Sequence, residues 1–404
     1  MGLKGNMKPV TQAGFTAALW LAAAIAIAGQ QSSYTVQRQQ ALLLEQQHNL
    51  IEAEAAWQAL SKTYPKNPEP YAQLGLLEAR QEHYKEAVPL YRQALAINPK
   101  VPGLRLNLAL ALFKSGQLKE AIPEFAAALK SAPPNSPDAQ RLTILLAMSH
   151  YGLGEYAAAA PLLKQAAAHD AQNLPLRLAL AHSCLWTKQN QCVMDVYREI
   201  LNLDAESAEA DMLAGEALDD MKDNEGSTKM FRAAVKANPN EPNVHFGLGY
   251  LLWTQKQYPE AATEFQAELA NDPAHAQAML YLGDTYLQLN KPEDARPLLQ
   301  RALELSPSLW LASLDLGIID SDAGRNDEAL RELQAAAKLK DDDVNVHWRL
   351  ARLYRTMGRK DEAKIEFDKA SKLNKAADED LYRKIANGRQ RPPDTTSPAV
   401  APNP

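Results

Sequence analysis

The sequence predicts an all-α fold, an α-solenoid of stacked helical hairpins, and three observations lead to this prediction. Hydrophobic residues make up 46% of the 404 residues while only 18 are glycine, a composition that suits packed helices better than sheets. Turn-closing prolines recur at a constant interval along the chain. Small and large apolar side chains recur at fixed places within that interval. A fixed period of this kind indicates a repeat architecture.

The proline series sets the phase of the repeat. Two sets of three prolines share one spacing: Pro65, Pro99 and Pro133, then Pro239, Pro273 and Pro307. The interval from Pro133 to Pro239 equals three such periods plus four positions, and the surplus fits the proline-rich turn at residues 133–137. Two intermediate repeats carry Ala171 and Ala205 in place of the closing proline.

Three other positions in the period agree with this phase. A first small position holds Gly75, Ala109, Ala147, Ala181, Gly215, Gly249, Gly283, Gly317 and Ala351. A second small position, in the second half of the period, holds Ala87, Ala121, Ala159, Ala261, Ala295, Ala329 and Ala363. A large apolar position one helical turn later holds Tyr91, Phe125, Leu163, Tyr197, Phe231, Phe265, Leu299, Leu333 and Phe367. Small residues let two helix backbones approach to roughly 8–10 Å, and the large side chain fills the space beside them.

This pattern resembles the tetratricopeptide repeat, a helix–turn–helix of roughly 34 residues with small residues at fixed positions and a closing proline. The resemblance covers residues 34–377 and implies a right-handed superhelix of ten helix hairpins. The expected repeats are residues 34–67, 68–101, 102–135, 140–173, 174–207, 208–241, 242–275, 276–309, 310–343 and 344–377. Each hairpin leaves one apolar face uncovered, and only its neighbours can bury that face.

The two ends of the chain differ from the repeats. Residues 1–28 combine a lysine-bearing start with an uncharged apolar stretch that ends in Ala26-Ile27-Ala28, the pattern of a secretory signal peptide. An uncleaved N-terminal anchor is the alternative, and in both cases the repeats are expected outside the cytoplasm. Residues 29–33 are interpreted as a linker. At the other end we expect a separate capping helix at residues 378–388 and a proline-rich disordered tail at 389–404.

The resemblance also implies where a partner binds, because first helices line the concave face in this family. Carried over position by position, the expected groove consists of Leu106, Leu110, Phe113, Met148, Tyr151, His182, Leu185, Trp186, Phe246, Tyr250, Trp253, Leu280, Leu287, Trp348, Arg349, Arg352 and Arg355. Asp284 lies among them. Aromatic and arginine side chains are enriched in binding hot spots, so the expected occupant is an extended or helical protein segment. The alternative is that these side chains pack between neighbouring helices.

Other kinds of site receive little support from the sequence. The net charge of -6 is unlike the basic face of a nucleic-acid binder. The familiar catalytic and phosphate-binding motifs do not occur, so the prediction is a protein without enzymatic activity, cofactor or metal site. Cys184 and Cys192 are interpreted as two buried free thiols. The alternative is a disulfide, since the hairpin could bring their Cα atoms within the roughly 4.4–6.8 Å that a disulfide requires.

The predicted function is that of a protein–protein interaction scaffold, exported to a bacterial periplasm for envelope assembly, secretion or polysaccharide export. One alternative is a membrane-anchored regulator of envelope biosynthesis that faces the cytoplasm. The chain resembles one bacterial family of that kind in length and repeat array, but that family has a four-cysteine rubredoxin-like knuckle and this sequence has two cysteines. A second alternative is an enzyme with its site in the groove, which shifted carboxylates or histidines gathered there would favour.

Overall fold

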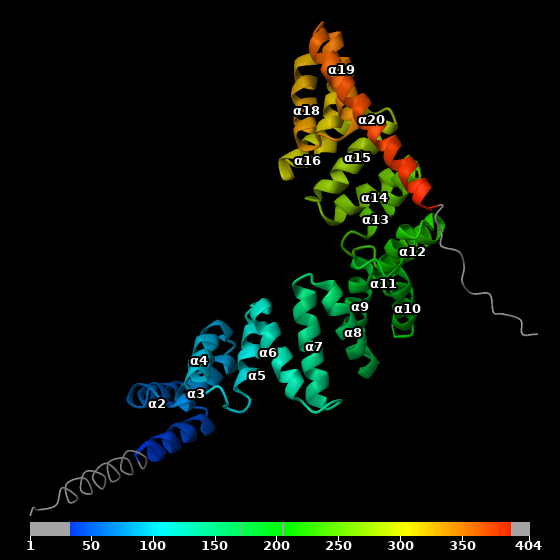
Figure 1. The fold of residues 1–404 in the computed structure, drawn as a ribbon. Coiled ribbons are helices and arrows are strands. Elements are labelled where there is room, and N and C mark those ends of the chain that lie inside the picture. Colours follow the sequence, from blue (N-terminus) through cyan, green and yellow to red (C-terminus); the bar gives the residue numbers. More distant parts are fainter. Residues whose placement is uncertain (1–32, 171, 204–205, 389–404) are drawn as a thin grey trace, which may run out of the picture. The chain divides into compact units, whose positions relative to one another are not determined.

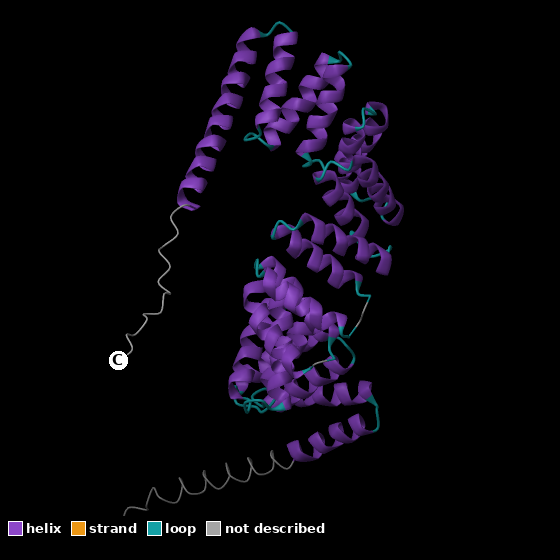
Figure 2. Ribbon diagram, turned by 90° about the vertical axis from the view of Figure 1, so that its right-hand side faces the viewer, coloured by secondary structure: helices purple, strands orange, loops and turns teal. Residues whose placement is uncertain are grey.

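The computed structural model describes residues 33–170, 172–203 and 206–388, with side chains described as far as residue 379. Every regular element in these ranges is a helix (Figure 2). The predicted signal or anchor at residues 1–28, nearly all of the linker, and the tail at 389–404 lie outside them. The prediction of an all-α solenoid is confirmed, because consecutive helices pack in pairs along the chain (Figure 1).

The helices alternate between the first and second helix of each repeat. The first helices are residues 33–46, α3 (Pro68–Arg80), α5 (Leu104–Lys114), α7 (Pro137–Gly152), α9 (Leu174–Trp186), α11 (Ala208–Asp220), α13 (Val244–Thr254), α15 (Ala276–Gln288), α17 (Trp310–Asp322) and α19 (Val344–Thr356). The second helices are α2 (Leu50–Thr63), α4 (Tyr84–Ile97), α6 (Leu118–Ser131), α8 (Tyr156–His169), α10 (Asn190–Leu201), α12 (Asn224–Ala237), α14 (Tyr258–Asn271), α16 (Pro292–Leu305), α18 (Asn326–Leu339) and α20 (Lys360–Gly388). Two compact units divide the chain, residues 1–192 and 193–404, and each is described by itself below.

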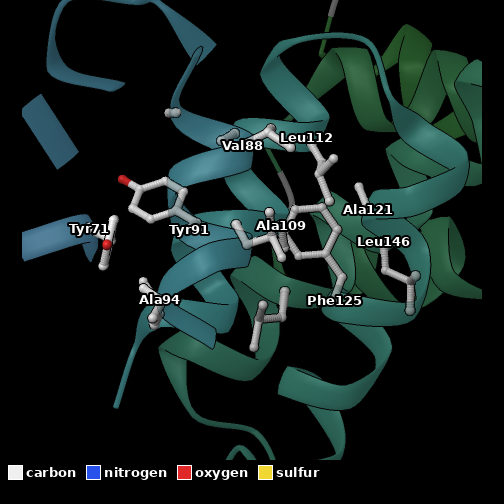
Figure 3. Packing of buried hydrophobic residues seen from close by; sticks show 14 residues of the cluster. Tyr71, Val88, Tyr91, Ala94, Ala109, Leu112, Ala121, Phe125 and Leu146 are labelled. Carbon is white, nitrogen blue, oxygen red and sulfur yellow. The ribbon is translucent and has the colours of Figure 1, made fainter. Parts of the chain in front are cut away.

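Each hairpin is held together by the small and large positions found in the sequence. A Cβ atom added to Gly75 would lie 2.7 Å from the ring of Tyr91, and one added to Gly317 would lie 2.6 Å from Leu333. Only a residue without a side chain fits so close an approach. Most of the large side chains are buried, with Tyr197 and Phe367 partly exposed, and Figure 3 shows Phe125 among Ala109, Leu112 and Leu146 in the first unit.

The turn inside every hairpin uses the same backbone conformation. One residue in each of the ten turns has a positive φ, between 58° and 79°: His48, Glu82, Gly116, Gly154, Lys188, Lys222, Lys256, Asn290, Gly324 and Gly358. This left-handed conformation ends a helix readily, and glycine adopts it without the steric cost that a Cβ atom imposes. The phase of the repeat therefore continues through turns that have different sequences.

The closing prolines act one residue beyond the helix cap. Helix α4 ends at Ile97, and the cap residue Asn98 is extended, with φ −143° and ψ 102°, immediately before Pro99. A residue that precedes proline is forced away from the helical region by the proline ring. Asn238 before Pro239 and Asp272 before Pro273 have the same extended conformation. Where the closing proline is present, it thus stops the second helix by restricting the residue before it.

The prediction of a separate capping helix at residues 378–388 is wrong. Helix α20 runs without interruption from Lys360 to Gly388 over 29 residues, so the second helix of the last repeat continues through this segment. The physical reason lies in the sequence of the junction. Residues 373–380 read LNKAADED, which contains neither the proline that follows six of the preceding second helices nor a glycine.

The preferred interpretation of the two cysteines as free thiols is also corrected. A disulfide joins Cys184, near the end of α9, to Cys192 in α10, with a Cα–Cα distance of 5.9 Å. Both residues belong to the same hairpin and to the first unit. The left-handed turn at Lys188, midway between them, brings the two helix ends together. The bond therefore closes the hairpin at its turn.

Candidate functional site

The first helices of the second unit provide a shared surface on which the predicted groove residues can be located. Helices α13, α15, α17 and α19 each contact the next one, as well as their own second helices. Side chains at equivalent places in successive repeats can therefore meet along this row of helices. Two groups of predicted residues lie here, an aromatic group on α13 and α15 and a basic group on α19.

The aromatic group joins three predicted residues to one that was not predicted. Phe246 and Tyr250 stack with ring centroids 6.4 Å apart, and Trp253 stacks on Tyr250 at 6.0 Å. Tyr281 of α15 meets Tyr250 edge-on at 5.2 Å and Trp253 at 5.1 Å. Phe246 is half-buried and packs on the core residue Phe265, whereas Tyr250 is 37% exposed. The solvent-facing part of the group is therefore Tyr250, supported by the rings around it.

A buried carboxyl group lies against this aromatic group. Trp253 donates its indole N–H to Oδ2 of Asp284, and Gln288 donates to Oδ1 at 3.4 Å. The side chain of Asp284 is 6% exposed. Burial raises the pKa of this carboxyl group above its ordinary value, although the two hydrogen bonds lower it in part. The geometry makes Asp284 an acceptor that the aromatic rings partly cover.

A second carboxyl group lies beyond Asp284 on α17. Asp315 is 3% exposed, and its Oδ2 atom has no hydrogen-bond partner among the described residues. Burial, and next the negative charge of Asp284, hold the pKa of Asp315 well above its ordinary value, while the guanidinium of Arg349 lowers it. Two acids and one arginine thus share a poorly solvated place between α15, α17 and α19.

The basic group on α19 surrounds one indole ring. The guanidinium carbon of Arg352 lies 4.7 Å from the centroid of Trp348, and that of Arg349 lies 5.6 Å from it. Trp348 is 41% exposed, so this cation–π group faces solvent. The predicted residue Arg355 turns elsewhere, since its guanidinium lies 5.8 Å from the ring of Phe367 on α20.

The predicted residues of α7 and α9 in the first unit form a separate aromatic cluster. His182 Nδ1 lies 3.2 Å from the Tyr151 hydroxyl, and Trp186 Nε1 donates to His182 Nε2 at 3.0 Å. Tyr156 at the start of α8 stacks on Trp186 with centroids 5.6 Å apart. Burial lowers the pKa of His182, which favours the neutral ring whose Nε2 can accept from Trp186. Trp186 remains 63% exposed, so this cluster offers an aromatic surface.

Other predicted groove residues are less accessible. Leu185 and Leu280 are 6% and 4% exposed, so they belong to the interior and cannot line a surface. For Leu280 the physical reason is that it packs in the core cluster that contains Leu299 of α16 and Leu316 of α17. A further set of predicted residues is half-buried, and those in helices α5 and α15 pack against core clusters: Leu106, Leu110, Phe113, Met148 and Leu287.

Sequence reasoning missed three residues of these groups, namely Tyr156, Tyr281 and Asp315. Tyr281, Asp315 and Arg349 occupy one repeat position, immediately before the shared leucine of the first helix. From the repeat pattern alone, a side chain at this position is expected to pack inside the solenoid. In the structure the position lies where adjacent first helices meet. The signal was available, because an acid and a base one full period apart, Asp315 and Arg349, would be expected to approach each other across neighbouring repeats.

Two other features help to define the chemistry. The acidic turn at residues 320–324 is occupied by ion pairs, since Asp320 accepts from both Arg296 and Arg325. Within the described ranges, no three His, Cys, Asp or Glu side chains are placed to hold a metal ion. Those ranges also contain no helix with the length and apolar character needed to cross a membrane.

Comparison with known proteins places this architecture in a family. Profiles described as "Tetratricopeptide repeat" match residues 38–102, 212–276 and 246–309, residues 78–144 and 321–387, and residues 140–165. Anaphase-promoting complex subunit 3 of Schizosaccharomyces pombe is 25% identical over 163 residues, which are 40% of this chain and 24% of that protein. The match therefore spans about a quarter of the length of that relative.

Solved structures similar to parts of the chain come from several tetratricopeptide proteins. YrrB, described as a TPR protein with an unusual peptide-binding site, is 21% identical, covers 47% of this chain and 97% of its own, and has a TM-score of 0.39. PilF of Pseudomonas aeruginosa is 18% identical over 49% of this chain and 89% of its own, with a TM-score of 0.44. MamA of Desulfovibrio magneticus RS-1 is 19% identical over 42% and 96%, with a TM-score of 0.38. From the repeated profile matches and the hairpins that carry them, this chain belongs to the tetratricopeptide-repeat family.

Proposed function

We propose that this protein is a non-catalytic scaffold that binds a peptide or protein partner along the first-helix surface of its repeats. Tetratricopeptide-repeat proteins are protein-interaction scaffolds. The observation that carries the proposal is the exposure of one large aromatic side chain in each of three first helices. Trp186 is 63% exposed, Tyr250 37% and Trp348 41%. Aromatic side chains in such positions are the usual anchors of protein interfaces.

The buried acids Asp284 and Asp315 are the feature that an enzyme hypothesis would use. Two adjacent carboxyl groups with raised pKa values are typical of acid–base sites. A general acid or base must, however, reach the proton that it transfers, and Asp315 is 3% exposed. This geometry supports a role in recognition better than one in catalysis.

Two exposed aromatic residues provide a test with matched controls. Trp186→Ala and Tyr250→Ala are expected to weaken capture of a partner that co-purifies reciprocally with the wild-type protein. The controls are Ile365→Ala and Leu305→Ala on second helices, because Ile365 is 63% exposed and Leu305 37%. Equal capture by all four variants, with helicity retained, would contradict binding along the first-helix surface.

We further propose that the repeats act outside the cytoplasm, in envelope assembly, secretion or polysaccharide export of a bacterium. Support comes from the basic start and short apolar stretch of residues 1–28 and from the disulfide Cys184–Cys192, a bond that persists in oxidising compartments. Fusion of alkaline phosphatase after residue 388 tests the location, since the enzyme is active only when exported. An inactive fusion would instead favour a regulator that faces the cytoplasm.

A further inference from the structure

Asp284, Asp315 and Arg349, which lie between α15, α17 and α19, comprise two acidic groups and one basic group. Asp284 and Asp315 are 6% and 3% exposed, and the negative charge of Asp284 disfavours ionisation of Asp315. Arg349 is the cation that acts on Asp315. Among the residues that the structure describes, Asp284 accepts hydrogen bonds from neutral groups alone, the indole of Trp253 and the amide of Gln288. When both carboxyl groups are ionised, the three side chains carry a net negative charge that a further cation would neutralise.

Two of these side chains also have buried polar atoms without a hydrogen-bond partner among the described residues. Oδ2 of Asp315 and Nε of Arg349 are both buried atoms without a hydrogen-bond partner in the described part of the chain. A buried polar atom without a partner loses its hydration and gains nothing in return, so native structures seldom keep one without a reason. Arg349 therefore leaves one oxygen of the Asp315 carboxyl group without a hydrogen bond. Asp284, one repeat away, has no cationic hydrogen-bond partner of its own among the described residues.

The aromatic group beside Asp284 suits a cation. Tyr250, Trp253 and Tyr281 have mutual centroid distances of 5.1–6.0 Å, and Tyr250 is 37% exposed. A lysine or arginine head group within about 6 Å of such a ring is attracted by its quadrupole. A side chain that enters along Tyr250 would approach Asp284, because Trp253 contacts both of these residues.

We propose that Tyr250, Trp253, Tyr281 and Asp284 form a subsite for one lysine or arginine side chain of a bound peptide. The rings flank the hydrocarbon stem and the head group, and Asp284 receives the positive charge. Asp315 lies deeper and does not touch the ligand. This inference rests on the proposed function, since it names the chemistry of a partner bound to the first-helix surface.

The charges on α19, which follows α17 in the row of first helices, restrict where that basic residue binds. Trp348 on α19 already has two guanidinium groups close to its ring, those of Arg349 and Arg352. A second basic residue of the peptide placed over α19 would be repelled by them. The subsite therefore selects peptides in which the basic residue lies over α13 and α15, and an acidic residue is tolerated towards α19.

The experiment uses the full chain and a phage-displayed library of random dodecapeptides as the probe. We expect the enriched peptides to share one lysine or arginine. Replacing that residue by glutamine should weaken binding to the wild-type protein about tenfold, the scale of a single buried charge pair. Against Asp284→Asn the same replacement should change binding less than about twofold, because the paired charge is already absent. Glu304→Gln, which removes an exposed acid from α16, should behave like the wild type.

The outcomes separate the two proposals. Failure to enrich any peptide would overturn the proposed function and this subsite with it. Enriched peptides without a shared basic residue, or an equal loss against wild type and Asp284→Asn, would overturn the subsite alone. Tyr250→Leu is the second variant should Asp284→Asn fail to fold, because it removes the exposed ring and leaves the buried acids in place. It should reduce the lysine-to-glutamine effect, and an undiminished effect would overturn the role of the aromatic group.

Discussion

Trp253 on α13 donates its indole N–H to Asp284 on α15, and this bond joins two successive repeats of the second unit. It links an apolar ring to an acid that is 6% exposed. Trp253→Phe would keep most of the ring and remove the donor. We expect a loss of about 1–3 kcal/mol in the free energy of unfolding, because the carboxyl group loses its main neutral partner.

Urea unfolding followed by far-ultraviolet circular dichroism measures this loss. The matched control is Trp348→Phe, which removes an indole that is 41% exposed and should change stability by less than about 0.5 kcal/mol. Similar effects of the two substitutions would show that the bond to Asp284 adds nothing to the packing of the ring.

The close contact between Gly249 and Phe265 gives a second prediction. A Cβ atom on Gly249 would lie 2.8 Å from the ring of Phe265, inside van der Waals contact. Gly249→Ala should therefore destabilise the second unit by about 1–3 kcal/mol through overpacking. The double variant Gly249→Ala/Phe265→Ala provides the control, because the methyl group should cost much less once the ring is absent. Additive losses would mean that the cost arises elsewhere.

The left-handed hairpin turns distinguish glycine from other residues. Gly324 has φ 71° and no atom within 4 Å of an added Cβ, so Gly324→Ala introduces only backbone strain. The expected loss is about 1 kcal/mol in the free energy of unfolding. Lys256 has φ 62° and already carries a Cβ atom, so Lys256→Ala should have almost no effect. Equal losses at the two turns, measured by urea unfolding, would contradict this account.

Reduction of the disulfide should loosen the hairpin of α9 and α10. The bond closes a short loop with a sequence separation of 8 residues, for which chain entropy predicts a stabilisation of about 2–3 kcal/mol. We expect a reductant to lower the urea midpoint of the wild type and to leave that of Cys184→Ser/Cys192→Ser unchanged. Peptide mapping without reductant identifies the bond directly, and a thiol-labelled Cys184 in the untreated protein would contradict it.

The buried acids predict a pH dependence with a definite sign. The folded pKa of Asp315 lies above its unfolded value, chiefly because of burial. Folding therefore favours the protonated form, and this contribution is complete below the unfolded pKa of about 3.9 and is lost as the pH rises through the folded pKa. Asp315→Asn, which cannot ionise, should raise stability at pH 7 by about 1 kcal/mol.

Below the unfolded pKa the same substitution should have little effect, because Asp315 is then protonated in both states. Urea unfolding of the two proteins from acidic to neutral pH checks the prediction. Asp322→Asn on the exposed end of α17 is the control, since its side chain is solvated. A constant difference between Asp315→Asn and the wild type at every pH would show that ionisation is not the cause.

Much of the fold followed from the sequence because the repeat positions are steric requirements. A small residue such as Gly75 must face a large one such as Tyr91 if two helices are to approach closely, and the constant period repeats that requirement along the chain. The continuous helix α20 was not predicted, because the repeat pattern ends at residue 377 and we expected the helix to end there too. Residues 373–380 contain no residue that stops a helix, so the helix continues.

The candidate site was predicted less completely. Tyr250, Trp253 and Trp348 were found because first-helix positions could be assigned by phase, and all three reach the surface at least in part. Leu280 was placed in the groove because phase gives the direction of a side chain but not how closely the next helix covers it, and Asp315 was not singled out. The disulfide was left open because spacing alone does not fix whether two thiols react.

The pairing of a small and a large residue inside every hairpin has a consequence for damage to the protein. Because each repeat contacts only its neighbours, replacing Gly317 by a large residue should destabilise the hairpin that contains it and the two adjacent hairpins. Amide exchange would then accelerate over a few turns of helix and stay slow elsewhere. Because the effect stays local, the sequence of one repeat can change while the other repeats keep their fold.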